Sequence, residues 1–437
     1  MGGIKYMKLN YKRTFLVGLA FLSISMFWQM YDFVIPLILI NKFNIRVDIA
    51  NAIMAIDNVL GLFMLPLFGV LSDKVSTKIG RRMPFILGGT AVAAIFTVIL
   101  PVAAKSGNLL LFMIALGLVL IAMATYRSPA VALMPDVTAK PIRSQGNAVI
   151  NLMGTLGGTI FLAMKMIIKT ENHDYSTIFY IVAGLMVACV LVLFLTVNEN
   201  KYRKEMEDIN YGDELIEDPE KLIETDESKK SDKLPKDVMK SMLFLLASIF
   251  LWVFGYNAVT TAFSQYVVNF FELPESLAAG FLMVATLTSV ATFIPVAYLT
   301  SRIGRKKTIL GALTLGMILF AIAFFIKDFS FFANFLFGGV GIVAGTITVN
   351  TLPMVLEMSK GATIGKFTGY YYTTTMSSQI FTPVIVGRLF YLIGYQVLFP
   401  YAVVCLALSF IAMLFVKHGD SRPIMKEKKL EAYDVED

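Results

Sequence analysis

Long apolar segments decide what this chain can fold into. About twelve of them follow one another along 437 residues, and each can cross the hydrocarbon core of a bilayer as a helix of roughly 20 residues. The segments lack the alternation of apolar and polar residues that membrane strands show. We expect spans at residues 14–41, 49–71, 84–104, 108–134, 146–168, 177–197, 241–271, 276–300, 308–327, 330–357, 367–391 and 395–417. The sequence therefore predicts an all-α integral membrane protein with twelve transmembrane helices.

The composition excludes several other classes of protein. Hydrophobic residues make up 57% of the chain and charged residues only 16%, which is far from the balance of a soluble domain. The two cysteines, Cys189 and Cys405, fall in different spans, so we expect neither a disulfide framework nor a metal site. Both histidines, His173 and His418, lie outside the spans, so a proton relay inside the membrane would use carboxylates. No Walker-type phosphate-binding loop occurs, and we expect no cofactor.

Basic residues fall mainly on one side of the predicted spans. Lysines and arginines cluster before the first span, at 74–82, at 140–143, at 302–307 and in the C-terminal tail. An excess of positive charge marks the cytoplasmic side, so both termini are predicted to be cytoplasmic, which requires an even number of spans. The net charge of +7 therefore needs no nucleic-acid partner. We expect the chain to reside in the cell membrane as a multi-pass protein.

A charged segment at mid-chain divides the sequence into two halves. We expect an N-terminal six-helix bundle at 1–197, a solvated cytoplasmic linker at 198–240, a C-terminal bundle at 241–417 and a cytoplasmic tail at 418–437. The halves resemble repeats, because Gly80-Arg81-Arg82 has a counterpart in Gly304-Arg305-Lys306 and Pro129 has one in Pro353, both about 224 residues later. Such duplication is typical of secondary transporters.

One loop motif narrows the class further. Gly69, Asp73, Gly80, Arg81 and Arg82, between the second and third spans, match the signature of the major facilitator superfamily, which the sequence therefore resembles. The longer spacing from Asp73 to Gly80, followed by Pro84-Phe85-Ile86, resembles the glycoside–pentoside–hexuronide:cation symporters, and specifically their sucrose-transporter-like branch. This resemblance implies two six-helix bundles around a central cavity, and a carrier rather than an enzyme.

The chemistry of this loop suggests a gate. Asp73, at a helix end, can accept hydrogen bonds from backbone N–H groups of a neighbouring helix terminus and can pair with Arg81 or Arg82. Such a clasp would hold one conformation and release in another. The alternative is that the basic residues only orient the protein in the membrane.

Three ionisable residues inside the spans are candidates for cation coupling. Asp32 and Asp57 lie at similar depths in the first and second spans, and Arg127 lies in the fourth. A poorly solvated carboxylate with a second one nearby favours protonation, and an arginine in reach would oppose it. The alternatives are structural carboxylates satisfied by hydrogen bonds, and an arginine that snorkels or pairs with Asp136.

Polar and aromatic residues on several spans could bind a hydroxylated solute. A sugar needs bidentate hydrogen-bonding groups together with an aromatic platform. The candidates are Trp28, Gln29, Asn147, Asn151, Tyr256, Asn257, Gln265, Tyr371 and Gln379. The alternative is that these groups bond helices to one another or mark the membrane interface. Gly154 and Gly158 are expected to permit close helix approach.

The remaining charges near helix ends have simpler explanations. Lys165 and Arg388 are expected to snorkel to the outer surface, and Glu357 to pair with Lys360.

The sequence taken together predicts proton-coupled symport of a sugar or glycoside by alternating access, carried out by a monomer. Cation-coupled members of the resembled family have further acids on spans two and four, where this chain has Gly61, Leu65 and Arg127, which favours protons over sodium. Two alternatives stay open. One is a proton-driven exporter of lipophilic compounds, and the other is a non-transporting membrane sensor.

Overall fold

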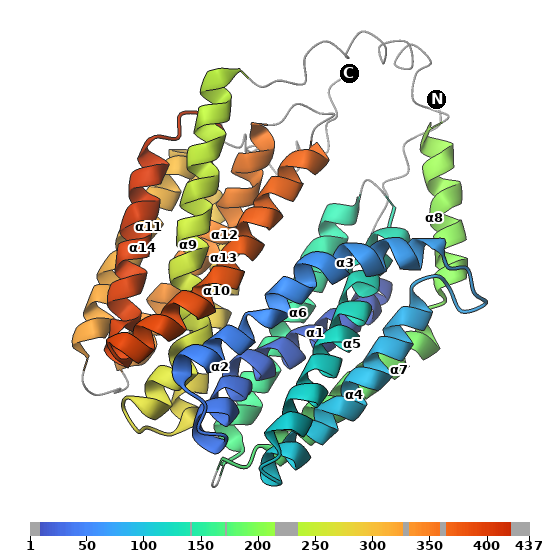
Figure 1. Cartoon of the computed structure of the whole chain (residues 1–437). Helices are drawn as coiled ribbons and strands as arrows, with labels where there is room; N and C mark the ends of the chain where they lie inside the picture. Colours follow the sequence, from blue (N-terminus) through green and yellow to red (C-terminus); the bar gives the residue numbers. More distant parts are fainter. Residues whose placement is uncertain are drawn as a thin grey trace. The chain divides into compact units, whose positions relative to one another are not determined.

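The computed structural model describes residues 9–139, 142–170, 173–214, 235–326, 332–358 and 364–420, and within these ranges it contains helices and no strand (Figure 1). The helices are α1 (Tyr11–Leu37), a π-helical continuation (Ile38–Lys42), α2 (Val47–Met54), α3 (Ile56–Lys74), α4 (Met83–Lys105), α5 (Leu109–Asp136), α6 (Arg143–Ile167), α7 (Ser176–Thr196), α8 (Glu199–Glu214), α9 (Lys236–Asn269), α10 (Glu275–Ile303), α11 (Arg305–Phe325), α12 (Phe332–Glu357), α13 (Ile364–Leu392), a 3-10 turn (Tyr395–Val397) and α14 (Leu398–Leu414).

Membrane-spanning length and apolarity are found for eleven helical segments among the described residues. Every span expected from the sequence coincides with helical segments, within about five residues at each end, but the span at 49–71 is divided into α2 and α3. The helix α13, which corresponds to the expected span 367–391, is not among these eleven segments. It is 29 residues long, but residues 370–378 are rich in tyrosine, threonine and serine. The chain is therefore a multi-pass membrane protein, whereas the count of twelve spans and the cytoplasmic position of both termini stay predictions.

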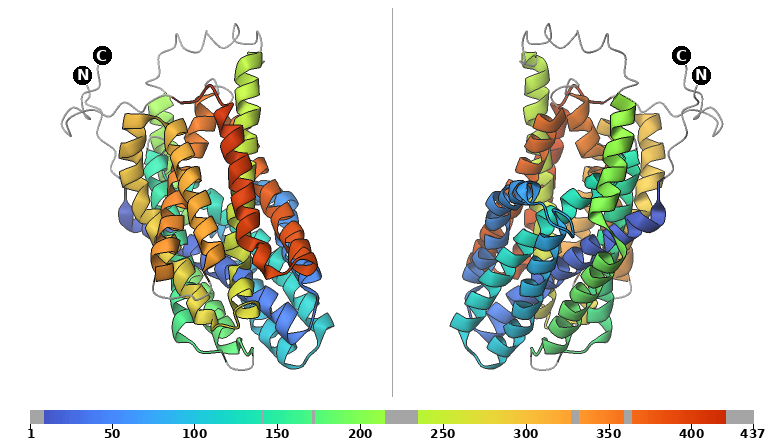
Figure 2. Two further views of the ribbon diagram at one scale, coloured as in Figure 1. Left: turned by 90° about the vertical axis from the view of Figure 1, so that its left-hand side faces the viewer. Right: turned by 90° about the vertical axis from the view of Figure 1, so that its right-hand side faces the viewer.

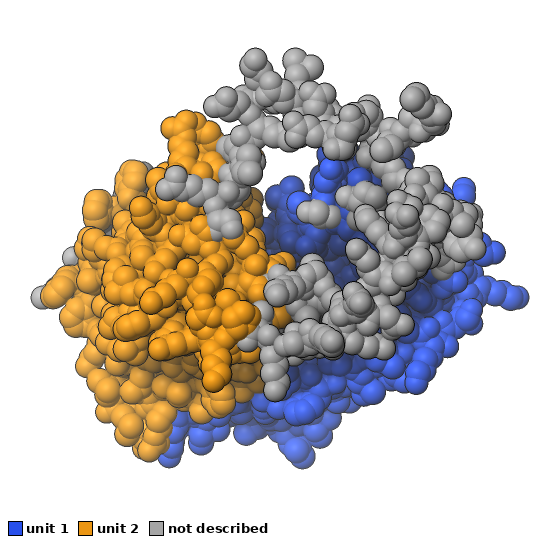
Figure 3. Space-filling model, turned by 90° about the horizontal axis from the view of Figure 1, so that it is seen from above, with its two compact units in different colours: residues 1–232, 264–280 blue, residues 233–263, 281–437 orange. Residues whose placement is uncertain are grey.

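Two compact units make up the chain (Figure 3). Unit 1 consists of Met1–Asp232 and Ser264–Gly280, and unit 2 of Lys233–Phe263 and Phe281–Asp437. The end of α9 and the start of α10 thus belong to unit 1, although the rest of both helices belongs to unit 2.

The segment expected as a linker, 198–240, begins with α8 and ends inside α9, while its middle (215–234) and the tail at 421–437 lie outside the described residues.

Glycines bring α1 and α6 into close contact in unit 1. A Cβ atom at Gly157 would collide with the backbone of Leu22, and one at Gly154 would lie 3.0 Å from the Oγ of Ser25. Close approach at Gly154 is thus confirmed, but the backbone contact is made by Gly157, which the sequence analysis did not name. A Cβ atom at Gly158 would lie at an ordinary 3.5 Å from Gln29. On its other side α1 packs on α7, and α4 lies between α5 and α7 (Figure 2).

Unit 2 uses the same device between α10 and α12. Cβ atoms at Gly341 and Gly345 would collide with the backbone carbonyls of Ala285 and Ser289, one turn apart. The two helices therefore approach closely along one glycine face.

Candidate functional site

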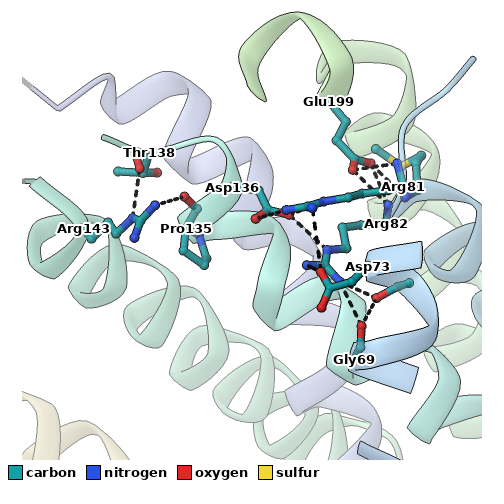
Figure 4. Close-up of polar contacts among 11 residues, drawn as sticks. Gly69, Asp73, Arg81, Arg82, Pro135, Asp136, Thr138, Arg143 and Glu199 are labelled. Carbon is teal, nitrogen blue, oxygen red and sulfur yellow. Dashed lines mark hydrogen bonds and ion pairs between the residues drawn. The ribbon is translucent and has the colours of Figure 1, made fainter. Parts of the chain in front are cut away.

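The loop at residues 75–82 is organised around a carboxylate that the sequence did not single out. Glu199, the first residue of α8, accepts hydrogen bonds from the backbone N–H groups of Arg81, Arg82 and Met83 at 2.8, 2.9 and 2.9 Å (Figure 4). Its side chain is buried, and these donors are the free N–H groups at the start of α4, where a negative charge is favoured. Gly80 adopts φ +121°, and a side chain there would collide with Glu199.

The sequence expectation for this cap is therefore corrected. The helix N–H groups donate to Glu199 and not to Asp73. The reason is geometric: Asp73 lies at the end of α3, with its side chain half exposed and turned to the arginines, whereas Glu199 follows α7 directly and lies under the first turn of α4.

The two arginines join three helices at this loop. Asp136, at the end of α5, accepts hydrogen bonds from Arg81 Nη2 at 2.7 Å and from Arg82 Nε at 3.0 Å. Arg82 also pairs with Asp73, and its Nη1 donates to the carbonyl of Gly69 at 3.2 Å. Gly69, Asp73, Arg81 and Arg82 are therefore in one connected network, and Gly80 lies against Glu199.

The charges of this network reinforce one another. Burial alone would lower the pKa of Arg81, but its hydrogen bonds to Asp136 and the charges of Asp136, Asp73 and Glu199 outweigh that effect and raise its pKa. Arg81 therefore keeps its positive charge over all physiological conditions.

Unit 2 carries a smaller version of the same construction. Gly304 has φ +93°, and the backbone N–H of Lys306 donates to Asp420 at 2.8 Å. Arg305 pairs with Glu357, as Arg81 pairs with Asp136 in unit 1. The expected partner of Glu357, Lys360, lies outside the described residues, so the pairing with Arg305 is the one the structure establishes.

Asp32, Asp57 and Arg127 lie in unit 1, on α1, α3 and α5. Asp32 and Asp57 are close enough to interact electrostatically, as are Asp57 and Arg127. The guanidinium carbon of Arg127 lies 5.9 Å from the centroid of the Trp28 ring. Asp136 binds Arg81 and Arg82, which removes the alternative that Arg127 pairs with it. Among the described residues, no ion pair within 4.0 Å joins any of these three charges to a partner.

Trp28 presents both a ring and a polar atom in this cluster. Its ring lies edge-on to Phe27 and Tyr31, with centroids 5.4 Å apart in each case. Its indole N–H is buried and has no hydrogen-bond acceptor within the described part of the chain. A buried N–H without an acceptor is costly unless a ligand or water supplies one.

The other proposed sugar contacts divide between the two units. Gln29, Asn147 and Asn151 lie in unit 1, the first on α1 beside Gly158 and the other two exposed on α6. Tyr256, Asn257, Tyr371 and Gln379 lie in unit 2, half-buried on α9 and α13.

Two residues have surroundings that differ from the sequence expectation. Gln265 is buried, and its amide exchanges two hydrogen bonds with that of Asn51, at 3.0 and 3.1 Å. Lys165 is not a snorkelling residue: its side chain is 2% exposed and forms an ion pair with Glu275. The sequence shows only a lysine near a helix end, which is compatible with either arrangement.

Comparison with known proteins identifies the family. The sequence model of the Major Facilitator Superfamily matches residues 17–338 and 279–433. The chain belongs to this superfamily of membrane transporters.

Its curated relatives are distant sugar transporters. The chain is 31% identical over 121 residues to the sucrose transport protein SUC3 of Arabidopsis thaliana, covering 23% of this chain and 20% of that one. It is 22% identical over 292 residues to an isoprimeverose transporter of Lactiplantibacillus pentosus, covering 63% and 56%. The chain thus spans about a fifth and just over half of the lengths of these two proteins.

Solved structures show the same fold. The nucleoside transporter NupG superimposes with a TM-score of 0.65 at 14% identity, covering 92% of this chain and 100% of that one. A POT family transporter in complex with a peptide gives 0.66 at 13% identity, covering 92% and 96%. At this identity the likeness concerns the fold alone.

Proposed function

We propose that this transporter carries a sugar or glycoside together with protons by alternating access. The observation that carries the proposal is that unit 1 holds three ionisable residues inside its membrane helices, Asp32, Asp57 and Arg127, without an ion-pair partner among the described residues. Arg127 lies over the ring of Trp28. Ionisable groups inside a membrane are costly and are retained where they bind an ion or a substrate. The named substrates of the two curated relatives, sucrose and isoprimeverose, support a sugar.

The coupling follows from electrostatics. Two neighbouring carboxylates repel each other when both are ionised, so one proton is shared or bound favourably by Asp32 and Asp57. A positively charged Arg127 would take part in this exchange by attracting the carboxylate that releases the proton. A sugar hydroxyl that hydrogen-bonds to a carboxylate changes this balance, so that the solute and the proton bind together.

Sugar recognition uses the remaining groups of the cluster. The indole N–H of Trp28 needs an acceptor, which a sugar hydroxyl supplies, and its ring offers an apolar face to the sugar ring. Gln29, Asn147 and Asn151 add amide donors and acceptors in unit 1. Tyr256, Asn257, Tyr371 and Gln379 are further candidate sugar contacts in unit 2. The network of the 75–82 loop stabilises one state of the cycle.

The test is uptake of labelled sugars by purified protein in proteoliposomes under an imposed pH gradient. The expected result is accumulation of at least one sugar, with alkalinisation of the external medium as protons follow it inward. Asp57→Asn should abolish gradient-driven accumulation while leaving exchange of sugar across the membrane measurable, because a neutral residue mimics the protonated state. Asp174→Asn, an exposed carboxylate in the loop before α7, serves as the matched control.

Two results would contradict the proposal. Full accumulation by Asp57→Asn would remove this residue from coupling. Efflux of lipophilic dyes without sugar-dependent proton movement would favour an exporter instead. A cell-membrane location and a monomeric state are part of the same proposal, and fractionation and the detergent-corrected mass test them.

A further inference from the structure

Residues 264–280 are tied to unit 1 at three separate points. The hydroxyl of Ser264 donates to the carbonyl of Phe33 on α1 at 3.1 Å. Gln265 and Asn51 on α2 form the reciprocal amide pair. Glu275, the first residue of α10, pairs with Lys165 on α6. Three helices of unit 1 therefore hold the segment in which the chain turns from α9 into α10.

The ion pair at the start of α10 is buried. The side chains of Lys165 and Glu275 are only 2% and 11% exposed. Lys165 also donates to Thr170 and lies 5.3 Å from the ring centroid of Tyr175, whose hydroxyl donates to Glu275 Oε1 at 2.5 Å. Oε1 of Glu275 thus accepts a hydrogen bond from Tyr175, while Oε2 is the atom of the ion pair with Lys165 and accepts no hydrogen bond in the described part of the chain. A buried pair of this kind contributes specificity, and removing one partner is strongly unfavourable because the other charge stays buried.

We propose that Lys165, Tyr175 and Glu275 form a latch that holds residues 264–280 on unit 1 in one state of the transport cycle and must open in another. The inference rests on the proposed alternating access. Its physical basis is position: the rest of α9 and α10 belongs to unit 2, so a movement of that unit pulls on this segment. Gln265 belongs to the same set of attachments, and we assign its amide to Asn51 rather than to the sugar.

A surface ion pair nearby provides the matched control. Lys105 and Asp174 lie 2.9 Å apart, but their side chains are 55% and 44% exposed, so their pairing is screened by water. Neutral substitutions can therefore be compared between the buried pair, Lys165 and Glu275, and the exposed pair, Lys105 and Asp174. Asp174 directly precedes Tyr175 in the sequence.

Hydrogen–deuterium exchange of the full-length protein in detergent tests the latch without sugar or proton gradient. Lys165→Met and Glu275→Gln should each speed exchange of the amides of residues 265–277 about tenfold or more. The double variant should show a smaller increase than either single variant, because no charge is left without its partner. Lys105→Met and Asp174→Asn should leave this segment unchanged.

Global unfolding is separated from latch opening by two further measurements. Exchange in α4 must stay at its wild-type rate in the variants, and Tyr175→Phe, which removes one hydroxyl only, should give an increase of about threefold. Unchanged exchange at 265–277 in both charge variants, or a change equal to that of the controls, would overturn the latch. Since the readout needs no transport, failure of the sugar assay leaves this result interpretable, and failure of the exchange assay leaves the sugar proposal standing.

Discussion

The two units cap a helix in the same way but with unequal strength. In unit 1 the buried Glu199 binds three backbone N–H groups and lies against Gly80, whereas in unit 2 the exposed Asp420 binds the N–H of Lys306 beside Gly304. Both carboxylates follow the last membrane helix of their unit, and both glycines have positive φ. The difference teaches that the same cap geometry can form a buried clamp in one unit and a surface contact in the other.

The largest expected difference between the copies concerns the carboxylates. Glu199→Ala leaves buried N–H groups without an acceptor and should lower the free energy of unfolding by about 3 kcal/mol. Asp420→Ala should cost about 1 kcal/mol, as for the loss of an ordinary helix cap. Denaturant titration of both variants in detergent measures the difference. Equal losses would mean that the two caps do the same work despite their different burial.

The glycines should differ in the same direction. Gly80→Ala adds a Cβ that collides with Glu199 to the strain of a positive φ, and should cost about 2 kcal/mol or more. At Gly304 the new Cβ would lie 3.1 Å from the exposed Asp420, which can move, so about 1 kcal/mol is expected. The same titrations compare the two variants, and a larger cost at Gly304 would contradict the view that unit 1 is the rigid copy.

The third comparison exchanges the basic residues at equivalent positions. Arg82→Lys gives unit 1 the residue of unit 2 and removes the fork that contacts Asp73, Asp136 and Gly69 together, so sugar uptake should fall about tenfold. Lys306→Arg keeps the charge near the carbonyls of Leu414 and Val416 and should change uptake less than twofold. Initial rates at equal amounts of reconstituted protein decide between these outcomes.

The smallest effect is expected at the exposed ion pair. Hydrogen bonds from Ser176, together with Lys105, lower the pKa of Asp174 to about 2, whereas an unperturbed aspartate titrates near 3.9. Because the folded-state pKa is the lower one, the stabilisation exists above about pH 4 and is lost as the pH falls toward 2. Asp174→Asn should therefore shift the thermal midpoint by about 1 °C at most, equally at pH 5 and pH 8. A shift that grows between these pH values would show that another group titrates with it.

The helices could be predicted because each apolar run must be long enough to cross the bilayer. This length can be read from consecutive residues of the sequence. The partners of charged residues could not. Glu199 is 118 residues from Arg81, in a segment crowded with other acids, so nothing marked it as the acceptor. Lys165 was assigned to the surface because a lysine near a helix end looks the same whether it snorkels or is buried against Glu275. The group of Asp32, Asp57 and Arg127 was predictable, because charges inside apolar runs are conspicuous in themselves.

The backbone contact between Gly157 and Leu22 constrains how the transporter can work. At this contact no side chains separate the two helices, so neither helix can slide or tilt against the other. We therefore expect α1 and α6 to move together as one rigid pair. Trp28 on the first helix and Asn151 on the second therefore keep a constant spacing throughout the cycle. A rigid ligand bound only to these two side chains would have the same affinity before and after translocation, so its binding would not shift the equilibrium between the two states.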